Sequence, residues 1–86
     1  MFGRSSLFKK ALAACERLQA RFPHDVALAS IIAQLNYLID LDVGRTKDRS
    51  RLSEIVLGVQ AAREIEPLDL KTAELLYRVA EAARKM

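Results

Sequence analysis

Four cations alternate with small or acidic residues in the most polar stretch of the chain, which runs from Asp42 to Leu52. They are Arg45, Lys47, Arg49 and Arg51. Cations spaced in this way could neutralise a phosphate backbone, and the N-terminus of a following helix could bind an anion. The acidic residues Asp48 and Glu54 would repel phosphate. A solvated loop with local pairing or capping at Asp48 and Arg49 is therefore the preferred interpretation, and a nucleic-acid-binding loop is the alternative.

The groups that catalysis or metal binding would need are scarce. The sequence contains no glycine-rich phosphate loop, no Cys-x-x-Cys, no His-Glu-x-x-His and no nucleophile elbow centred on a serine. The single cysteine, Cys15, falls among apolar helical positions, and the single histidine, His24, falls in a turn without partner ligands. Carboxylates two positions apart point in different directions on a helix, so they make no acid–base dyad. We therefore expect no enzyme activity, no cofactor and no metal site.

Length and composition favour one domain that spans residues 1–86. The 14 basic and 11 acidic residues are mixed along the chain and give a net charge of +3, a weaker basic bias than dedicated nucleic-acid binders have. A lone cysteine excludes an intrachain disulfide and suits a reducing compartment. No apolar stretch is long enough to span a bilayer, and no signal peptide is seen. We expect a cytoplasmic protein that does not bind membranes.

Apolar residues recur every three or four positions in the first half of the chain, which predicts two amphipathic helices. The first apolar stripe is Leu7, Ala11, Ala14, Cys15, Leu18 and Phe22. The second is Leu28, Ile31, Ile32, Leu35, Leu38 and Ile39. We expect Ser5 or Ser6 to cap the first helix and Pro23 to end it, and we expect Asp25 to cap the second helix and Gly44 to end it.

Two further helices are predicted after the polar stretch. The third, capped by Asp48 or Ser50, carries the stripe Leu52, Ile55, Val56, Val59 and Ala62. The fourth, capped by Asp69, carries the stripe Leu70, Ala73, Leu76, Tyr77, Ala80 and Ala83. Pro67 closes the third helix, and Gly58 inside it indicates a close approach by a neighbouring helix or by a partner. Four helices with short connections predict an all-α fold, a small antiparallel bundle of four helices.

Two ordered sets of residues match a known family at its spacing. The first set is Arg21-Phe22-Pro23, Leu28, Ser30, Gln34-Leu35, Tyr37 and Leu38. The second set is Asp48-Arg49-Ser50, Leu52, Leu57-Gly58, Ala62 and Arg63-Glu64, with Asp69 and Tyr77 as looser matches. Together they resemble the small immunity proteins of type VI secretion that protect against an NAD(P)+-hydrolysing effector. The resemblance covers roughly Ala14 to Tyr77.

The resemblance implies an all-helical protein that binds the toxin domain of a cognate effector in an equimolar complex and blocks its active site. Such a protein protects the producing bacterium and its kin from the cytoplasm and catalyses nothing itself. Immunity proteins of one fold can serve toxins of different chemistry, so the substrate of the toxin stays open. A dimeric helical adaptor is the remaining alternative from another class, and a homodimer of the free protein stays open.

We predict that the toxin is contacted by charges at the end of the second helix, in the polar stretch and late in the third helix, with one tyrosine as an aromatic anchor. The candidates are Tyr37, Asp40, Asp42, Arg45, Asp48, Arg49, Glu64 and Glu66. A pocket that binds a dinucleotide needs cationic groups, so acidic side chains suit its occlusion. Within this set, we expect Asp48 to cap the third helix and Arg45 or Arg49 to face the partner.

Overall fold

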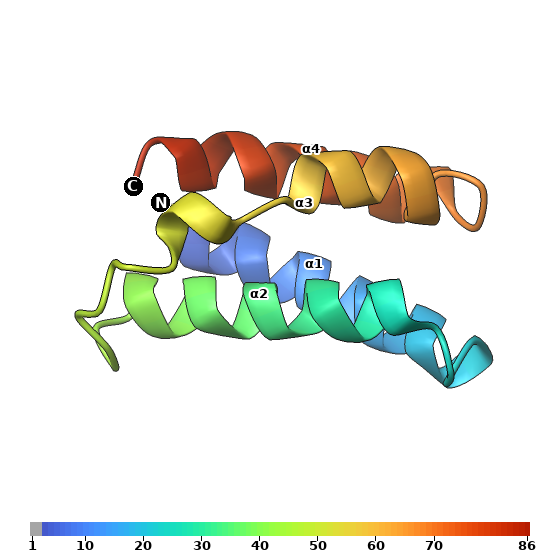
Figure 1. Cartoon of the computed structure of the whole chain (residues 1–86), viewed down its shortest axis with the longest axis horizontal. Helices are drawn as coiled ribbons and strands as arrows, with labels where there is room; N and C mark the ends of the chain where they lie inside the picture. The colour runs from blue at the N-terminus through green and yellow to red at the C-terminus, as the bar shows by residue number, and fades with distance from the viewer. Residues whose placement is uncertain (1–2) are drawn as a thin grey trace.

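The first half of the chain forms a hairpin of two long helices, α1 (Arg4–Arg21) and α2 (Val26–Asp42). The structure is a computed structural model that describes residues 3–86. The two helices lie side by side and run in opposite directions (Figure 1). This hairpin is the base on which the second half of the chain packs.

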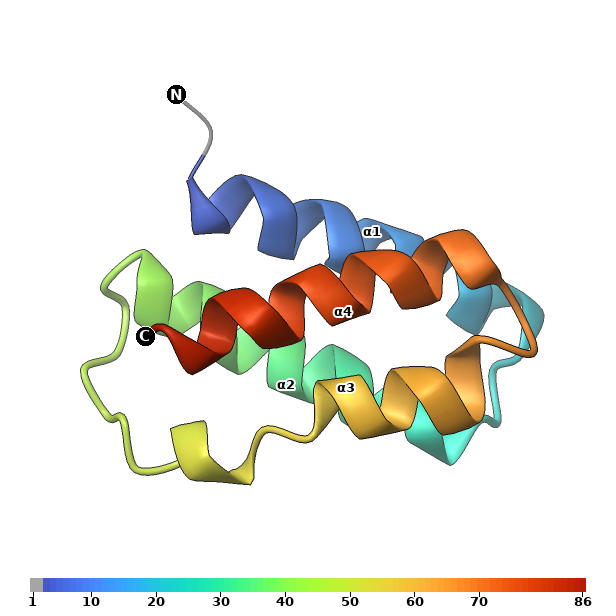
Figure 2. The same ribbon diagram turned by 90° about the horizontal axis from the view of Figure 1, so that it is seen from above.

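The second half is helical but broken into shorter pieces. A 3₁₀ turn, η1 (Leu52–Glu54), precedes a short helix, α3 (Leu57–Gln60), which continues into a π-helical segment, η2 (Ala61–Ile65). The last helix, α4 (Leu70–Arg84), lies along α1, and α3 with η2 lies along α4 and touches α2 (Figure 2). The predicted all-α bundle of four helices is confirmed.

The two ends of the bundle differ in what they carry. The polar connection, which we define as residues 43–51, lies at the end where α1 begins and α4 finishes (Figure 1). The turns at residues 22–25 and 66–69 lie at the opposite end (Figures 1 and 2). Among residues 3–86, no helix is long and apolar enough to cross a membrane.

Local signals set most of the boundaries of the hairpin. Asp25 Oδ1 accepts the Leu28 N–H at 3.0 Å, so the predicted cap of α2 is confirmed. Phe22, the residue before the proline, leaves the helical region as predicted, and Gly44 takes a φ of +84° after α2. The predicted cap of α1 by a serine is wrong, because the helix begins at Arg4 and both serines lie inside its first turn.

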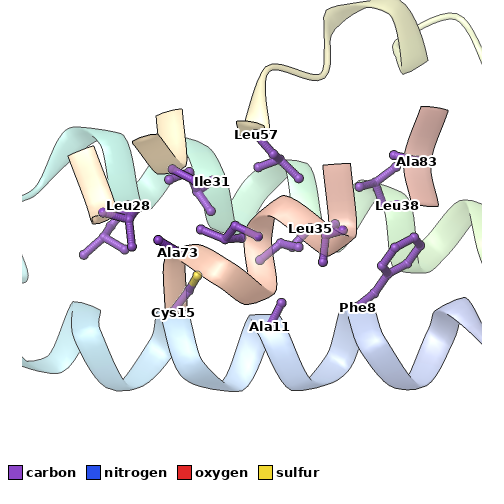
Figure 3. Close-up of a cluster of buried hydrophobic side chains, with 14 of the residues drawn as sticks. Phe8, Ala11, Cys15, Leu28, Ile31, Leu35, Leu38, Leu57, Ala73 and Ala83 are labelled. Carbon is purple, nitrogen blue, oxygen red and sulfur yellow. The ribbon is translucent and has the colours of Figure 1, made fainter. Parts of the chain in front are cut away.

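One apolar cluster joins all the helices (Figure 3). Its fully buried side chains include Phe8, Cys15, Leu28, Ile31, Leu35, Leu38, Leu57, Ile65, Leu76 and Val79. The predicted stripes of the first two helices are largely confirmed, but Phe22 and Ile32 are only partly buried and the start of α1 differs. The buried aromatic of α1 is Phe8, whereas its neighbour Leu7 is only partly buried. At its start, α1 therefore directs Phe8 into the core in place of Leu7.

The predicted continuous third helix is wrong. Ile55 is extended, with φ −71° and ψ 121°, and it separates η1 from α3. The buried residues are Leu57, Ala61 and Ile65, while Val59, which the predicted stripe placed inside, is exposed. β-Branched residues next to a glycine favour helix weakly, so tertiary contacts decide the path here. In η2 the Glu66 N–H donates to the Ala61 carbonyl at 2.9 Å. Donor and acceptor are five residues apart, as in a π-helix, instead of the four of an α-helix.

The fourth helix begins where predicted, and Ala73, Leu76 and Ala83 of its predicted stripe are buried. Asp69 is the N-cap residue, and its carboxylate accepts the Thr72 hydroxyl instead of a backbone N–H. Leu70 is 55% exposed, which contradicts its place in the predicted stripe, and Val79 is buried in its stead. A Cβ atom on Gly58 would lie 3.7 Å from that of Ala80, so the neighbour close to this glycine is α4.

Candidate functional site

The polar connection is anchored on α2 by Tyr37. The Tyr37 hydroxyl donates to the Asp48 carbonyl at 2.8 Å, and the Arg51 guanidinium lies over the tyrosine ring, 5.0 Å from its centroid. The side chain is nearly covered, with only 8% of the residue exposed. A cation over an aromatic face adds a favourable contact to the hydrogen bond. Tyr37, predicted as an aromatic anchor for the toxin, thus fixes the connection to the helix.

Two predicted acids are engaged in ion pairs of the fold itself. Asp40 pairs with Arg45 at 2.9 Å, and the Asp40 carbonyl accepts the Arg45 N–H at 2.8 Å. Asp42 pairs with Arg4 at 3.3 Å, and only 13% of the Asp42 side chain is exposed. The first pair closes the turn after α2, and the second ties the start of α1 to the end of α2. Asp40, Asp42 and Arg45 therefore organise this end of the bundle.

Asp48 stabilises a turn inside the connection and does not cap a helix. Its carboxylate accepts the Ser50 N–H at 3.0 Å, and its own N–H donates to Thr46 Oγ1 at 3.2 Å. The hydrogen bonds from Ser50 lower the pKa of the Asp48 carboxyl, so this exposed side chain stays charged at neutral pH. The predicted capping of the third helix by Asp48 or Ser50 is wrong, because η1 has no side-chain cap. Arg49 is exposed and has no ion-pair partner within 4.0 Å among residues 3–86.

Glu64 and Glu66 are separated from the other predicted contact residues. Glu64 belongs to η2, which with its following turn lies at the end of the bundle opposite the polar connection (Figure 1). The Glu66 carboxylate accepts the Tyr77 hydroxyl, and this bond raises the pKa of Tyr77. The structure thus gathers Tyr37, Asp40 and the connection at one end but leaves these two glutamates at the other.

A hollow of about 220 Å³ opens beside the connection, between α2 and η1. Ser30 and Gln34 line this hollow and take part in a set of side-chain amide hydrogen bonds that the sequence did not reveal. Gln34 Oε1 accepts the Val56 N–H at 2.9 Å, and Gln34 Nε2 donates to Gln60 Oε1 at 2.7 Å. Gln60 Nε2 donates in turn to Ser30 Oγ at 3.2 Å. These bonds hold the break before α3 against α2. The sequence signal for them was that Ser30 and Gln34 belong to the first set of residues that matches the family.

Replacing Gln34 with alanine is expected to lower the free energy of unfolding by about 1–2 kcal/mol, because the Val56 N–H and the Gln60 amide lose their partner. Asn36→Ala is the matched control, since Asn36 is exposed on the same helix, and its effect should stay within about 0.5 kcal/mol. Urea denaturation followed by circular dichroism measures both. Equal costs for the two variants would show that the amide contacts do not hold the second half of the chain.

Cys15 is buried in the core and serves as a small apolar side chain, as predicted. Burial, with the neighbouring Glu16 charge as the lesser cause, raises the pKa of the Cys15 thiol from 9.0 to about 11. The thiolate that a nucleophile needs is therefore disfavoured at neutral pH. Within the described part of the chain, no three histidine, cysteine or acidic side chains gather where they could hold a metal ion.

The helical arrangement matches a known family over nearly its whole length. The family model described as Tsi6 matches residues 4–85. The chain belongs to the Tsi6 family. It is similar to the solved structure of Tsi6 from Pseudomonas aeruginosa, with 27% identity, a TM-score of 0.88 and coverage of 95% of each chain. Among curated protein sequences, none matches.

Tsi6 is a type VI secretion immunity protein, so the resemblance stated from the sequence is confirmed at the level of the family. Membership of the Tsi6 family supports a role in immunity to a type VI effector and implies that the chain binds a cognate effector. An immunity family also points to a binding protein in place of an enzyme.

Proposed function

We propose that this protein binds the toxin domain of a cognate type VI effector in an equimolar complex and occludes its active site. The observation that carries the proposal is the similarity to Tsi6 over 95% of both chains, at a TM-score of 0.88. We further propose that the toxin is an NAD(P)+ glycohydrolase and that the complex forms in the cytoplasm of the producing cell. Binding there would neutralise the toxin before it turns over its substrate.

The charges that project from the bundle support a binding role. Asp48 and Arg49 stand exposed on a connection that Tyr37 and Arg51 hold in place, so little order has to be gained on binding. Asp48 keeps a negative charge at neutral pH and could enter a cationic, dinucleotide-binding pocket. Arg49 could then pair with an acid at the rim. Complementary charges would also speed the capture of an incoming toxin.

The remaining predicted contact residues take two different roles in this proposal. Asp40, Asp42 and Arg45 shape the binding end through their ion pairs and contact the toxin with the oxygen and nitrogen atoms that those pairs leave free. Glu64 and Glu66 lie at the opposite end, so they belong to the same interface only if the toxin wraps along the bundle. A standard interface involves about 20–30 residues on each partner, which makes such wrapping compatible with a chain of 86 residues.

Co-expression with the toxin domain encoded beside its gene tests the function. The toxin domain alone should arrest growth of a bacterial host and deplete NAD+, and co-expression of this protein should restore both. Arrest that persists despite expression of the folded protein would refute the immunity role. Arrest without loss of NAD+ would refute only the proposed toxin chemistry. Calorimetric titration of the purified pair should give one site per chain, and light scattering of the free protein tests for a homodimer.

A further inference from the structure

Two facing rows of cations line a hollow between the first and last helices. Lys10 and Arg17 come from α1, and Lys71 and Arg78 come from α4. The hollow has a volume of about 380 Å³, and α1 and α4 lie side by side along it (Figure 2). We call this surface the α1–α4 groove. Arg21 lines an adjoining hollow that continues the groove toward the turn at residues 22–25.

The cations of the α1–α4 groove make no ion pair within the part of the chain that the structure describes. Among residues 3–86, none of Lys10, Arg17, Lys71 and Arg78 lies within 4.0 Å of a carboxylate oxygen. Two acids share the hollow, but Asp69 already accepts the Thr72 hydroxyl. The lining therefore carries four positive charges against two negative ones. The end of α2 differs, because its acids Asp40 and Asp42 are paired with Arg45 and Arg4.

The two rows also have the same repeat. Lys10 and Arg17 are seven positions apart on one helix, and Lys71 and Arg78 are seven positions apart on the other. Seven residues are about two helical turns, so each row presents its two cations roughly 10 Å apart on one face. Parallel rows at one spacing offer a partner several carboxylate sites at once, and unpaired cations in a concave surface attract anions more strongly than scattered surface charges do.

We propose that the α1–α4 groove docks an acidic segment of the cognate effector. This inference rests on the proposed function and adds a second contact surface to it, away from the polar connection. A polypeptide fits better than a nucleic acid, because Asp69 and Glu74 in the same hollow would repel an unbroken run of phosphates. Separate carboxylates can be placed opposite the four cations and clear of both acids. Such a docking contact holds the effector while its active site is covered.

Charge reversal in the groove tests this proposal, with the purified toxin domain encoded beside the gene as the probe. Arg17→Glu on α1 and Arg78→Glu on α4 should each raise Kd at least about tenfold at low salt. Lys9→Glu is the matched control, because Lys9 is exposed on α1, makes the same charge change and does not line the groove. Its Kd should change by less than about threefold, as for a distant surface charge. Melting curves verify that each variant is folded, and Arg17→Gln replaces the glutamate variant if it is not.

The outcomes separate the groove from the function as a whole. Wild-type affinity in both groove variants would overturn the groove proposal and leave the immunity role intact. An equal loss in Lys9→Glu and Arg17→Glu would trace the effect to net charge and would also overturn it. Wild-type protein that does not bind the toxin domain would overturn the proposed function and the groove with it. Binding of a 20-base-pair DNA duplex that Arg17→Glu abolishes would assign the groove to nucleic acid instead.

Discussion

Replacing Phe8 with alanine is expected to lower the free energy of unfolding by about 3–5 kcal/mol, the usual cost of truncating a buried aromatic side chain. Phe8 is 0% exposed and points from α1 into the cluster of apolar side chains (Figure 3). The loss combines the apolar surface no longer buried with a cavity that its neighbours fill only in part. For a domain of this size, such a loss is a large share of the total stability.

Leu7→Ala is the control for this measurement, because Leu7 is the adjacent position and was the one predicted for the core. Since Leu7 is only partly buried, its truncation should cost less than about 2 kcal/mol. Urea denaturation of both variants, followed by circular dichroism, gives the comparison. A larger loss for Leu7→Ala than for Phe8→Ala would place α1 one residue out of register with the core.

Replacing Tyr37 with alanine should cost about 3–5 kcal/mol as well, because a nearly buried ring is removed together with its contacts to the polar connection. Tyr37→Phe keeps the ring and the stacked Arg51 but loses the hydroxyl that donates to Asp48. That variant should lose about 1 kcal/mol, the net worth of a single hydrogen bond. Thermal denaturation measures both values.

Amide hydrogen exchange identifies which residues lose protection in the Tyr37 variants. Residues 45–51 should exchange faster in both Tyr37 variants, and faster in the alanine variant, because the connection loses its attachment to α2. If Tyr37→Ala were as stable as the wild type yet failed to bind the toxin domain, Tyr37 would be an aromatic anchor for the toxin, and its role in the fold would be refuted.

The sequence predicted the two helices of the hairpin and three of their four ends correctly, because those signals are local. Asp25 caps α2, and Pro23 and Gly44 end the two helices, through contacts within a few residues. The prediction of a continuous third helix was wrong because the path of residues 52–65 depends on a distant side chain. Gln34, which accepts the Val56 N–H, lies 22 positions before Val56 in the chain. No pattern within residues 52–65 records that distant amide, so periodicity alone extended the helix through the break.

The candidate site was also predicted only in part. The charges around the polar connection were found, but the sequence did not reveal that Asp40 pairs with Arg45 and Asp42 with Arg4. The α1–α4 groove was missed altogether. Its cations lie off the predicted apolar stripes. They meet because α1 and α4 lie side by side, although the cations on the two helices are at least 54 positions apart in the chain.

The start of α1 and the end of α4 lie at the same end of the bundle as the polar connection, which has a practical consequence for experiments on this protein (Figure 1). A bulky fluorescent protein fused after α4 would lie at the same end of the bundle as Asp48 and Arg49 and would compete with a partner for that surface. The exposed turn at Pro23 and His24 lies at the far end of the bundle, and exposed turns tolerate inserted segments. Probes placed in that turn would leave Asp48 and Arg49 uncovered.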